Sequence, residues 1–462
     1  MQERFRQAFL DTLDYLNELD TNSAYWPDTV ECMVDDLLDY CHTISLFSQK
    51  DIVIHHLAEI KNLLSADMHS AIEHQLSEIR KIILAEESRV IVDFLILRQS
   101  HWAAMRPVID AFLEAKCVVR IVPTPMIQEI QDDWGKSLQA LIQKDGYEIV
   151  DFRDYNIETM LPDIVVDDMA VDCAKLQAFR FLRISKLIDY TVHIEHSLLT
   201  GYTEAMKSAY FRIGRSRCWQ YVVSSDLFAA AFPLIFRIDG EFLTAGYPEI
   251  DTIVKHQSDR KKQNGKKSVL WNIDALDPNR VLESDYLRLN RELDYLDKMS
   301  ICFPNLNHIV RTHPNLKNQA RASALIERLS RLCTERSNII YDSNALIYET
   351  YQNVDAMITW MSSTTAFTFA ATRKPFAVLP TFIENGYDTL LDMQLLKALY
   401  VIYRDQDMIA FLNAVVHGSD EKKEQRLQVL NNYVGALDGS VSSNIAKKVL
   451  AKYANKRSVR YS

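Results

Sequence analysis

The chain has 462 residues and a formal net charge of −10; 48% of its residues are hydrophobic and 25% are charged. A chain of this length exceeds one ordinary core, so two or three domains are expected. The apolar fraction is that of a globular protein and excludes collagen-like and disordered classes. The negative net charge argues against general nucleic-acid binding, which requires a basic surface.

The ends of the chain, its apolar stretches and its cysteines bear on where the protein resides. The N-terminus is charged and lacks the apolar core of a signal peptide. The longest apolar stretches, such as residues 227–236, have about half the length of a membrane-spanning helix. The seven cysteines are scattered without a Cys-x-x-Cys pair, which favours a reducing compartment over a disulfide framework or a zinc site. We therefore expect a cytoplasmic protein, either freely dissolved or peripheral at the inner face of the cell membrane.

Two basic clusters stand out against the acidic background. One is the run at residues 260–267, and the other is the C-terminal tail with Lys447, Lys448, Lys452, Lys456, Arg457 and Arg460. A solvated loop and a solvated helix end account for both clusters. The alternative is contact with an anionic membrane surface or an anionic polymer.

Residues 1–88 have the pattern of helices. Apolar residues recur at helical spacing, as in Phe9, Leu13 and Leu16. Pro27 and the polar residues before it separate a first helix from a second. We expect an all-helical N-terminal extension that serves as an oligomerisation arm or as a lid over a substrate.

At Val90 short apolar runs begin to alternate with helical stretches. A nearly continuous apolar run such as 90–97 is typical of a parallel strand that is covered on both faces. Strand–helix–strand units of this kind build a doubly wound sheet. Strands are predicted at 90–97, 117–122, 148–152, 163–166, 190–194 and 221–223. They define a Rossmann-like domain over residues 89–245.

A second alternating series follows the basic loop. Its strands are predicted at 268–271, 307–311, 338–341, 356–359 and 375–379. They define a second Rossmann-like domain over residues 246–420, and residues 421–462 are predicted to be C-terminal helices with the basic tail. The expected fold class is α/β, with two Rossmann-like domains facing across a cleft and an all-helical N-terminal extension.

Three segments fall where predicted strands end or the domains join, which is where open α/β sheets bind ligands. They are residues 246–251 (Gly-Tyr-Pro-Glu-Ile-Asp), 311–314 (Arg-Thr-His-Pro) and 359–365 (Thr-Trp-Met-Ser-Ser-Thr-Thr). A turn, a loop histidine and a helix cap would explain them as ordinary structure. The hydroxyl groups at a helix start would also form an anion site suited to a pyrophosphate.

Cofactor and metal sites have little support in the sequence. The chain contains no P-loop and no Gly-x-Gly-x-x-Gly motif, so NAD and ATP sites are not indicated. His193 and His196 would point to opposite faces of a strand, and no third ligand is near them. We expect no cofactor and no metal.

The three segments resemble those of the CDP-glycerol glycerophosphotransferases, the teichoic-acid and capsule polymer transferases of GT-B fold. Members show Gly-Tyr-Pro-x-x-Asp, then Arg-x-His-Pro, then Asp-x-x-Ile-Thr-Asp-Tyr-Ser-Ser followed by Lys-Pro. Here the third match runs from Asp355 to Ser363, and Lys374 begins the Lys-Pro pair. A family His-Gly segment has its counterpart at His196 and Ser197. The resemblance covers about residues 90–400.

Two positions depart from the family pattern. Trp360 and Met361 stand where the family has Asp-Tyr, so one carboxylate is missing. Ser197 replaces the glycine of the His-Gly pair. These departures leave open a GT-B nucleotide-sugar glycosyltransferase, a sugar-nucleotide 2-epimerase or a non-catalytic subunit of a capsule assembly complex, because fold does not fix function.

The resemblance implies transfer of a glycerol-phosphate or related alditol-phosphate group. The donor would be CDP-linked, and the acceptor a hydroxyl of a cell-surface polymer or its lipid-linked precursor. The first Rossmann-like domain would bind the acceptor and the second the donor nucleotide. The assigned residues are His196 and His313 for catalysis, Arg311, Ser362, Ser363 and Thr364 for the donor phosphates, and Gly246, Tyr247, Pro248 and Asp251 at the domain junction. His196 would be the general base, with His101 the next candidate.

Overall fold

The structure of the chain is a computed structural model. It describes residues 2–460 except 20, 22, 24, 44–46, 65–67, 126–135, 169–174, 195–217, 232–240, 259–264, 274–282, 314, 315, 317–321, 345, 361–363 and 380–396. Among the described helices, none is long and apolar enough to cross a membrane.

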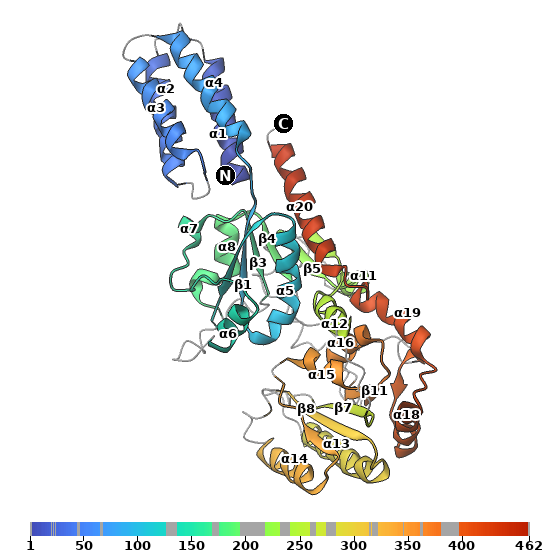
Figure 1. Cartoon of the computed structure of the whole chain (residues 1–462). Coiled ribbons are helices and arrows are strands. Elements are labelled where there is room, and N and C mark those ends of the chain that lie inside the picture. The colour runs from blue at the N-terminus through green and yellow to red at the C-terminus, as the bar shows by residue number, and fades with distance from the viewer. Residues whose placement is uncertain are drawn as a thin grey trace.

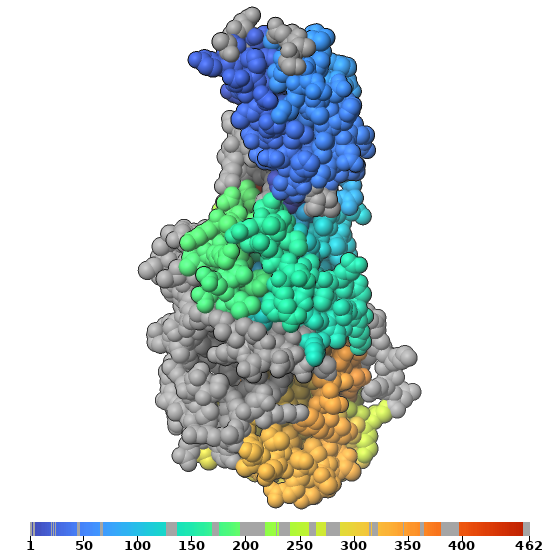
Figure 2. All heavy atoms as spheres, turned by 90° about the vertical axis from the view of Figure 1, so that its left-hand side faces the viewer, coloured from blue at the N-terminus to red at the C-terminus, as the bar shows by residue number. Residues whose placement is uncertain are grey.

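The N-terminal region is helical, as predicted. Its described residues form the helices α1 (Glu3–Glu18), α2 (Trp26–Thr43), α3 (Lys50–Leu64) and α4 (His69–Ala85). These helices bury a hydrophobic core of their own, which includes Phe9, Leu13 and Leu57. Gln2 connects this bundle to the first domain, because its Nε2 donates to the carbonyl oxygen of Leu161 at 2.7 Å. The bundle therefore stands at one end of the molecule, beyond the first domain (Figures 1 and 2).

The first domain is built on a parallel sheet. Its described strands are β1 (Ile91–Ile96), β2 (Val118–Pro123), β3 (Ile164–Asp167), β4 (Thr191–Ile194), β5 (Gln220–Val223) and β6 (Glu241–Thr244). They pair in the order β2-β1-β3-β4-β5-β6, and every neighbouring pair is parallel. The strand predicted at 148–152 does not form; Val150 donates one backbone hydrogen bond to Ile121, but no ladder follows. Strand β6 was not predicted.

Helices cover this sheet and explain why its strands are apolar throughout. All six residues of β1 are buried. The covering segments are α5 (Gln99–Glu114), α6 (Lys136–Lys144), α7 (Ile157–Met160), η3 (Gln177–Phe179), α8 (Phe181–Leu187) and α11 (Asp226–Ala231). Helix α5 begins just after the carboxyl end of β1, so its first turn lies at the sheet edge where ligands bind in such folds.

The second domain repeats this arrangement. The strands that the structure describes here are β7 (Ser268–Ile273), β8 (Asn307–Thr312), β9 (Ile339–Tyr341), β10 (Ala356–Trp360), β11 (Phe376–Leu379) and β12 (Tyr400–Val401), in the order β12-β11-β10-β7-β8-β9. All pairs are again parallel. The helical segments are α13 (Glu283–Cys302), α14 (Ser323–Glu335), α15 (Ile347–Asn353), α16 (Thr364–Phe369), η7 (Ala370–Thr372), α18 (Asp405–His417) and α19 (Lys423–Val434).

Two helices join the domains. Helix α12 (Glu249–Ser258) leads from the first domain to the second, and α20 (Val441–Arg460) returns to the first domain and runs along α5 (Figure 1). Val441, Ile445 and Val449 of α20 belong to the core of the first domain. The Tyr453 hydroxyl group of α20 donates to Asp163 Oδ1 at 3.0 Å.

The strand orders locate a switch point in each sheet, where the chain winds away in both directions. It lies between β1 and β3 in the first sheet and between β7 and β10 in the second. Because all strands are parallel, the carboxyl ends at each switch point lie at one edge, where doubly wound folds bind ligands.

Candidate functional site

A polar network spans the switch point of the second sheet. Asn272, near the end of β7, donates from Nδ2 to Thr359 Oγ1 of β10 at 3.1 Å and to Thr365 Oγ1 of α16 at 2.9 Å. Thr359 is fully buried and Asn272 almost so. The network fixes the first turn of α16 against the two strand ends. Sequence analysis did not single out Asn272, although a buried amide at a strand end is an unusual choice for a core position.

The hydroxyl residues predicted to hold phosphate follow β10 in the sequence. Ser362 and Ser363 lie outside the described residues, and of Thr364 only the backbone, at the start of α16, is described. Helix α16 has 6 residues, so the dipole contributes less at its start than that of a long helix would. The start of this short helix is therefore by itself a weak site for an anion.

His313 lies at the carboxyl edge of the second sheet, directly after β8. Its backbone N–H donates to Ile273 at 2.8 Å, which continues the pairing of β8 with β7. His313 is thus adjacent to the switch point of the second sheet.

The Arg311 side chain is held on the side of β8 that faces β9, by residues that follow β9. Its Nη1 donates to Asp342 Oδ2 at 2.7 Å and to the Asn344 carbonyl oxygen at 2.8 Å. Both members of the ion pair are largely buried. Asp342 follows β9, so the pair ties the ends of β8 and β9 together, and Arg311 already has a counter-ion.

Trp360 occupies a core position. Its side chain is 2% exposed, and its Nε1 donates to Glu292 Oε2 of α13 at 2.8 Å. The alternation along β10 puts Trp360 on the same face as Ala356 and Ile358, which belong to the same core cluster. The Arg288 guanidinium group lies over the indole ring. The residue that replaces the family carboxylate therefore packs under α13.

The side chain of Lys374, the lysine of the Lys-Pro pair, caps the C-terminus of α15. Its Nζ donates to the carbonyl oxygens of Tyr351 at 2.5 Å and Val354 at 2.7 Å, at the C-terminus of α15. A cation at this end satisfies carbonyl groups that have no partner within the helix. Its contacts are thus structural.

Four ionisable groups gather at the switch point of the first sheet. His101, in the first turn of α5, places Nδ1 3.0 Å from Asp168 Oδ2, just after β3. Asp168 Oδ2 also accepts a hydrogen bond from the backbone N–H of Leu97 at 3.4 Å. Next to it Lys175 donates to Asp167. All four side chains are at most 5% exposed.

Burial is the largest influence on the ionisation of Asp167 in this cluster. It raises the pKa of the Asp167 carboxyl group, while Lys175 and then His193 act in the opposite direction. His193 of β4 is the register partner of Asp167 and lies beside Tyr221. His196, the predicted base, lies outside the described residues, two positions beyond the end of β4.

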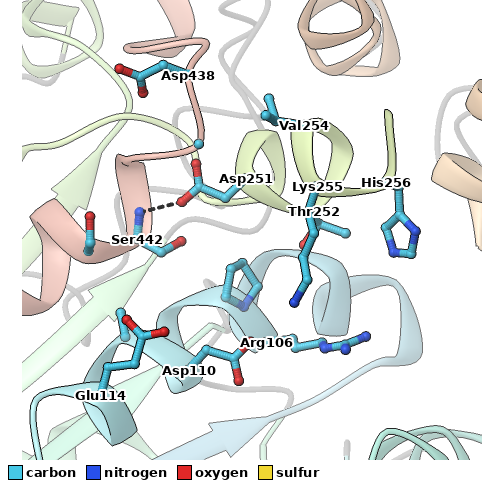
Figure 3. A pocket seen from close by; sticks show the side chains of 14 residues that line it. Arg106, Asp110, Glu114, Asp251, Thr252, Val254, Lys255, His256, Asp438 and Ser442 are labelled. Atoms are coloured by element: carbon cyan, nitrogen blue, oxygen red, sulfur yellow. Dashed lines mark hydrogen bonds between the residues drawn. The ribbon is translucent and has the colours of Figure 1, made fainter. Parts of the chain in front are cut away.

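Three of the predicted domain-junction residues, Gly246, Tyr247 and Asp251, contact the end of α19 and the start of α20, and we call this contact region the joint. Gly246 has φ +107°, and a Cβ atom there would come within 2.7 Å of a Val441 side-chain carbon. The backbone N–H of Tyr247 donates to the Val434 carbonyl oxygen at 2.9 Å. Asp251 accepts hydrogen bonds from the backbone N–H groups of Val441 at 3.2 Å and Ser442 at 2.6 Å, so it caps α20 (Figure 3). Burial raises the pKa of Asp251, and these hydrogen bonds oppose the rise.

A pocket of about 370 Å³ lies at this joint. It is lined from α5, α12 and the start of α20, with Arg106, Asp110, Glu114 and Lys255 among its charged residues (Figure 3). Of the predicted site residues only Asp251 lines it. The pocket therefore belongs to the junction between the domains and not to the strand ends.

Metal ligands do not gather in the described part of the molecule. Among the described residues, no group of three or more His, Cys, Asp or Glu side chains could hold a metal ion.

Comparisons with known proteins bear on family and fold. A family model described as CDP-Glycerol:Poly(glycerophosphate) glycerophosphotransferase matches residues 199–451, more than half of the chain. That segment contains the junction residues and the whole second sheet, but neither His101 nor His196. No curated protein that was compared with the chain matches it.

Several solved structures align with most of the chain. The S. aureus MnaA–UDP co-structure has a TM-score of 0.56 and 13% identity, over 79% of this chain and 97% of its own. A putative UDP-N-acetylglucosamine 2-epimerase from Listeria monocytogenes has a TM-score of 0.54 and 12% identity, over 80% and 98%. The wall teichoic acid polymerase TagF has a TM-score of 0.48 and 11% identity, over 87% and 98%. The two alignments above 0.5 show a shared fold and confirm the predicted pair of facing Rossmann-like domains.

Proposed function

The chain belongs to the CDP-glycerol:poly(glycerophosphate) glycerophosphotransferase family, and from this membership we propose the reaction that it catalyses. It transfers a glycerol-phosphate or related alditol-phosphate group from a CDP-linked donor to a hydroxyl group of a cell-surface polymer or its lipid-linked precursor. The observation that carries the proposal is the family match over residues 199–451, which includes the complete second sheet and the joint.

The reaction makes one bond and breaks another at phosphorus. The acceptor hydroxyl oxygen attacks the β-phosphorus of the donor, the bond to the α-phosphate oxygen breaks, and CMP leaves with the electron pair. The hydroxyl proton passes to a base. Negative charge accumulates on the leaving phosphate, so the site must supply hydrogen-bond donors or cations there.

The second domain is the proposed donor site. His313 stands beside the switch point, and Ser362, Ser363 and Thr364 follow the strand end that Asn272 braces. We assign these four residues to the donor phosphates. Arg311 contributes by holding the ends of β8 and β9 in place, because its guanidinium group is paired with Asp342.

The first domain is the proposed acceptor site. Two of its histidines are candidates for the base: His196, on the family pattern, and His101, which lies at the switch point. The acceptor polymer or its lipid-linked precursor would enter between the two sheet edges.

The C-terminal tail is proposed to attach the protein to an anionic membrane surface. Among the tail cations whose side chains the structure describes, Lys448 donates to the Thr244 carbonyl oxygen at 2.7 Å, and Lys452 pairs with Glu241. The cluster of positive charge in the last turns of α20, from Lys456, Arg457 and Arg460, is the segment proposed to meet the membrane.

Product analysis tests the proposed reaction. The purified protein is incubated with a poly(glycerol phosphate) acceptor and with CDP-glycerol or UDP-N-acetylglucosamine in separate reactions. We expect CMP release that depends on both CDP-glycerol and the acceptor, and no UDP release or epimerisation. Donor at about 100 times its dissociation constant should also stabilise the fold by about 2.7 kcal/mol. Turnover of the UDP-sugar, or of neither donor, would overturn the assignment.

A further inference from the structure

Two stretches of chain connect the first domain with the second, and they touch each other at two glycines. One stretch runs from β6 through Gly246 into α12, and the other runs from α19 through Gly435 to α20 (Figure 1). A Cβ atom on Gly435 would lie 2.5 Å from the Cα atom of Gly246. Carbon atoms in ordinary contact are about 3.5–4.0 Å apart, so a side chain at position 435 would force the two stretches apart.

The backbone conformation of Gly435 differs from that of an ordinary glycine at the end of a helix. Gly418, which ends α18, has φ 71° and ψ 25°, the left-handed conformation that commonly ends helices. Gly435 follows α19 with φ 79° and ψ −159°, a region that is essentially restricted to glycine. The end of a helix does not require this region. We therefore attribute it to the path of the chain across Gly246.

The contact lies where parts of both domains meet. The same Cβ atom on Gly435 would lie 3.3 Å from the carbonyl oxygen of Ser224, the first residue after β5. One residue before Gly435, the Val434 carbonyl oxygen accepts the hydrogen bond from the backbone N–H of Tyr247. A strand end of the first domain and both connecting stretches are thus packed against one another at the joint.

The hydrophobic core around the joint belongs to both domains. Val223 of β5, Val434 of α19 and Met357 of β10 are members of one buried cluster. The Ala103 carbonyl oxygen of α5 also accepts a hydrogen bond from Thr252 Oγ1 of α12 at 2.6 Å. Closely packed cores have low compressibility and transmit strain, so a backbone shift at the joint would reach both sheets.

We propose that Gly435 is a positioning residue for the transfer reaction. The donor is assigned to the second domain and the acceptor to the first, so the spacing of the domains sets the distance between the reacting atoms. These atoms must approach to about 3–3.5 Å, and a misplacement of about 1 Å can lower the rate about 10²-fold. The backbone contact of Gly435 with Gly246 keeps the two domains at this spacing. The proposal rests on the proposed transfer reaction and predicts a loss of rate without a loss of substrate binding.

Gly435→Ala tests the proposal by adding one methyl group to the contact. Steady-state transfer is measured with CDP-glycerol and a poly(glycerol phosphate) acceptor, and the affinities for donor and acceptor are measured by calorimetry. We expect kcat to fall about 10²-fold, because the added carbon atom forces the two stretches apart. Both affinities should stay near wild type, because each substrate is held by one domain. A folded Gly435→Ala with wild-type kcat, or one whose donor affinity falls as much as its kcat, would overturn the proposal.

Two other glycine variants control for backbone strain. Gly439→Ala changes the same connecting stretch at φ +86°, where the nearest atom would be a Val254 side-chain carbon at 3.5 Å, an ordinary contact. Gly418→Ala changes a glycine with φ +71°, and no atom of the described residues would lie within 4 Å of the new carbon. Both variants should unfold at a lower temperature than wild type, since alanine is strained at positive φ, and both should keep wild-type kcat. A loss of kcat in either variant as large as that in Gly435→Ala would assign the effect to strain and contradict the proposal.

A double-mutant cycle repeats the test from the other glycine and replaces Gly435→Ala if that variant does not fold. A Cβ atom on Gly246 would lie 2.7 Å and 3.0 Å from the two Cγ atoms of Val441. Gly246→Ala should therefore lower kcat, and adding Val441→Ala should restore kcat about 10-fold, because the two methyl groups in the way are removed. A double variant that recovers no kcat would count against the positioning role. Wild-type protein that does not turn over CDP-glycerol would instead refute the proposed reaction.

Discussion

The ionisation of Glu249 should make the free energy of unfolding depend on pH. It begins α12 at the joint, half-buried, and burial raises its pKa from 4.5 to about 7, with a hydrogen bond from Tyr247 acting in the opposite direction. A raised folded-state pKa means that the folded protein holds a proton that the unfolded chain releases between these values. Glu249 therefore contributes stability that is fully present below pH 4.5 and is lost as the pH rises through about 7.

Denaturant titrations at several pH values measure this contribution. In wild-type protein the free energy of unfolding attributable to Glu249 should fall by about 1–3 kcal/mol across the window. Glu249→Gln should remove that part of the pH dependence, because the amide does not titrate. Glu424→Gln, at an exposed position of α19, serves as the control. Identical pH profiles for wild type and Glu249→Gln would contradict the prediction.

At the scale of elements, the attachment of α20 depends on one carboxylate. Asp251 of α12 accepts two backbone hydrogen bonds from the first turn of α20 and so joins the connecting helix to the returning one. Asp251→Ala leaves two buried N–H groups without this acceptor, so we expect a loss of about 1–3 kcal/mol in the free energy of unfolding. Equilibrium denaturation gives the loss, and hydrogen exchange should show earlier opening of residues 441–453.

The neighbouring Asp438 provides the comparison for this cap. It accepts hydrogen bonds from Ser440, at 3.0 Å from the backbone nitrogen and 2.6 Å from Oγ, and these bonds stay within one loop. Asp438→Ala should therefore cost less than Asp251→Ala and leave exchange in α20 near normal. Equal losses in the two variants would show that the joint does not depend on Asp251.

At the scale of the molecule, the proposed membrane attachment can be separated from catalysis. Flotation with anionic and with neutral liposomes is measured for the full chain and for Lys456→Glu/Arg457→Glu. We expect the full chain to float with anionic liposomes, and the floated fraction to decrease as the salt concentration increases. The charge-reversed variant should stay in the fraction that does not float. The same preparations should transfer glycerol phosphate to a dissolved acceptor at similar rates. Equal flotation of both proteins would assign the tail to a solvated helix end.

Much of the architecture could be predicted from local patterns. Continuous apolar runs such as 90–97 predicted strands covered on both faces, since such runs leave no polar side for solvent. Two strands were not recognised: β6 has 4 residues and begins with the exposed Glu241, and β12 has 2 residues. Residues 148–152 have the composition of a strand, yet they make only one backbone hydrogen bond to a neighbouring strand, from Val150 to Ile121. Strand composition allows pairing, but a neighbouring strand with unused N–H and C=O groups decides whether it occurs.

The sequence by itself determined the fold class, the helical N-terminal region and the family pattern, because these depend on the order of residue types along the chain. Tertiary structure decided which residues meet. His101 and Asp168 are 67 positions apart and become neighbours only because β3 pairs with β1. Trp360 is directed into the core by its register on β10, and Asp251 meets α20 across 190 residues. Contacts of this kind follow from strand order and helix return, which local spacing does not encode.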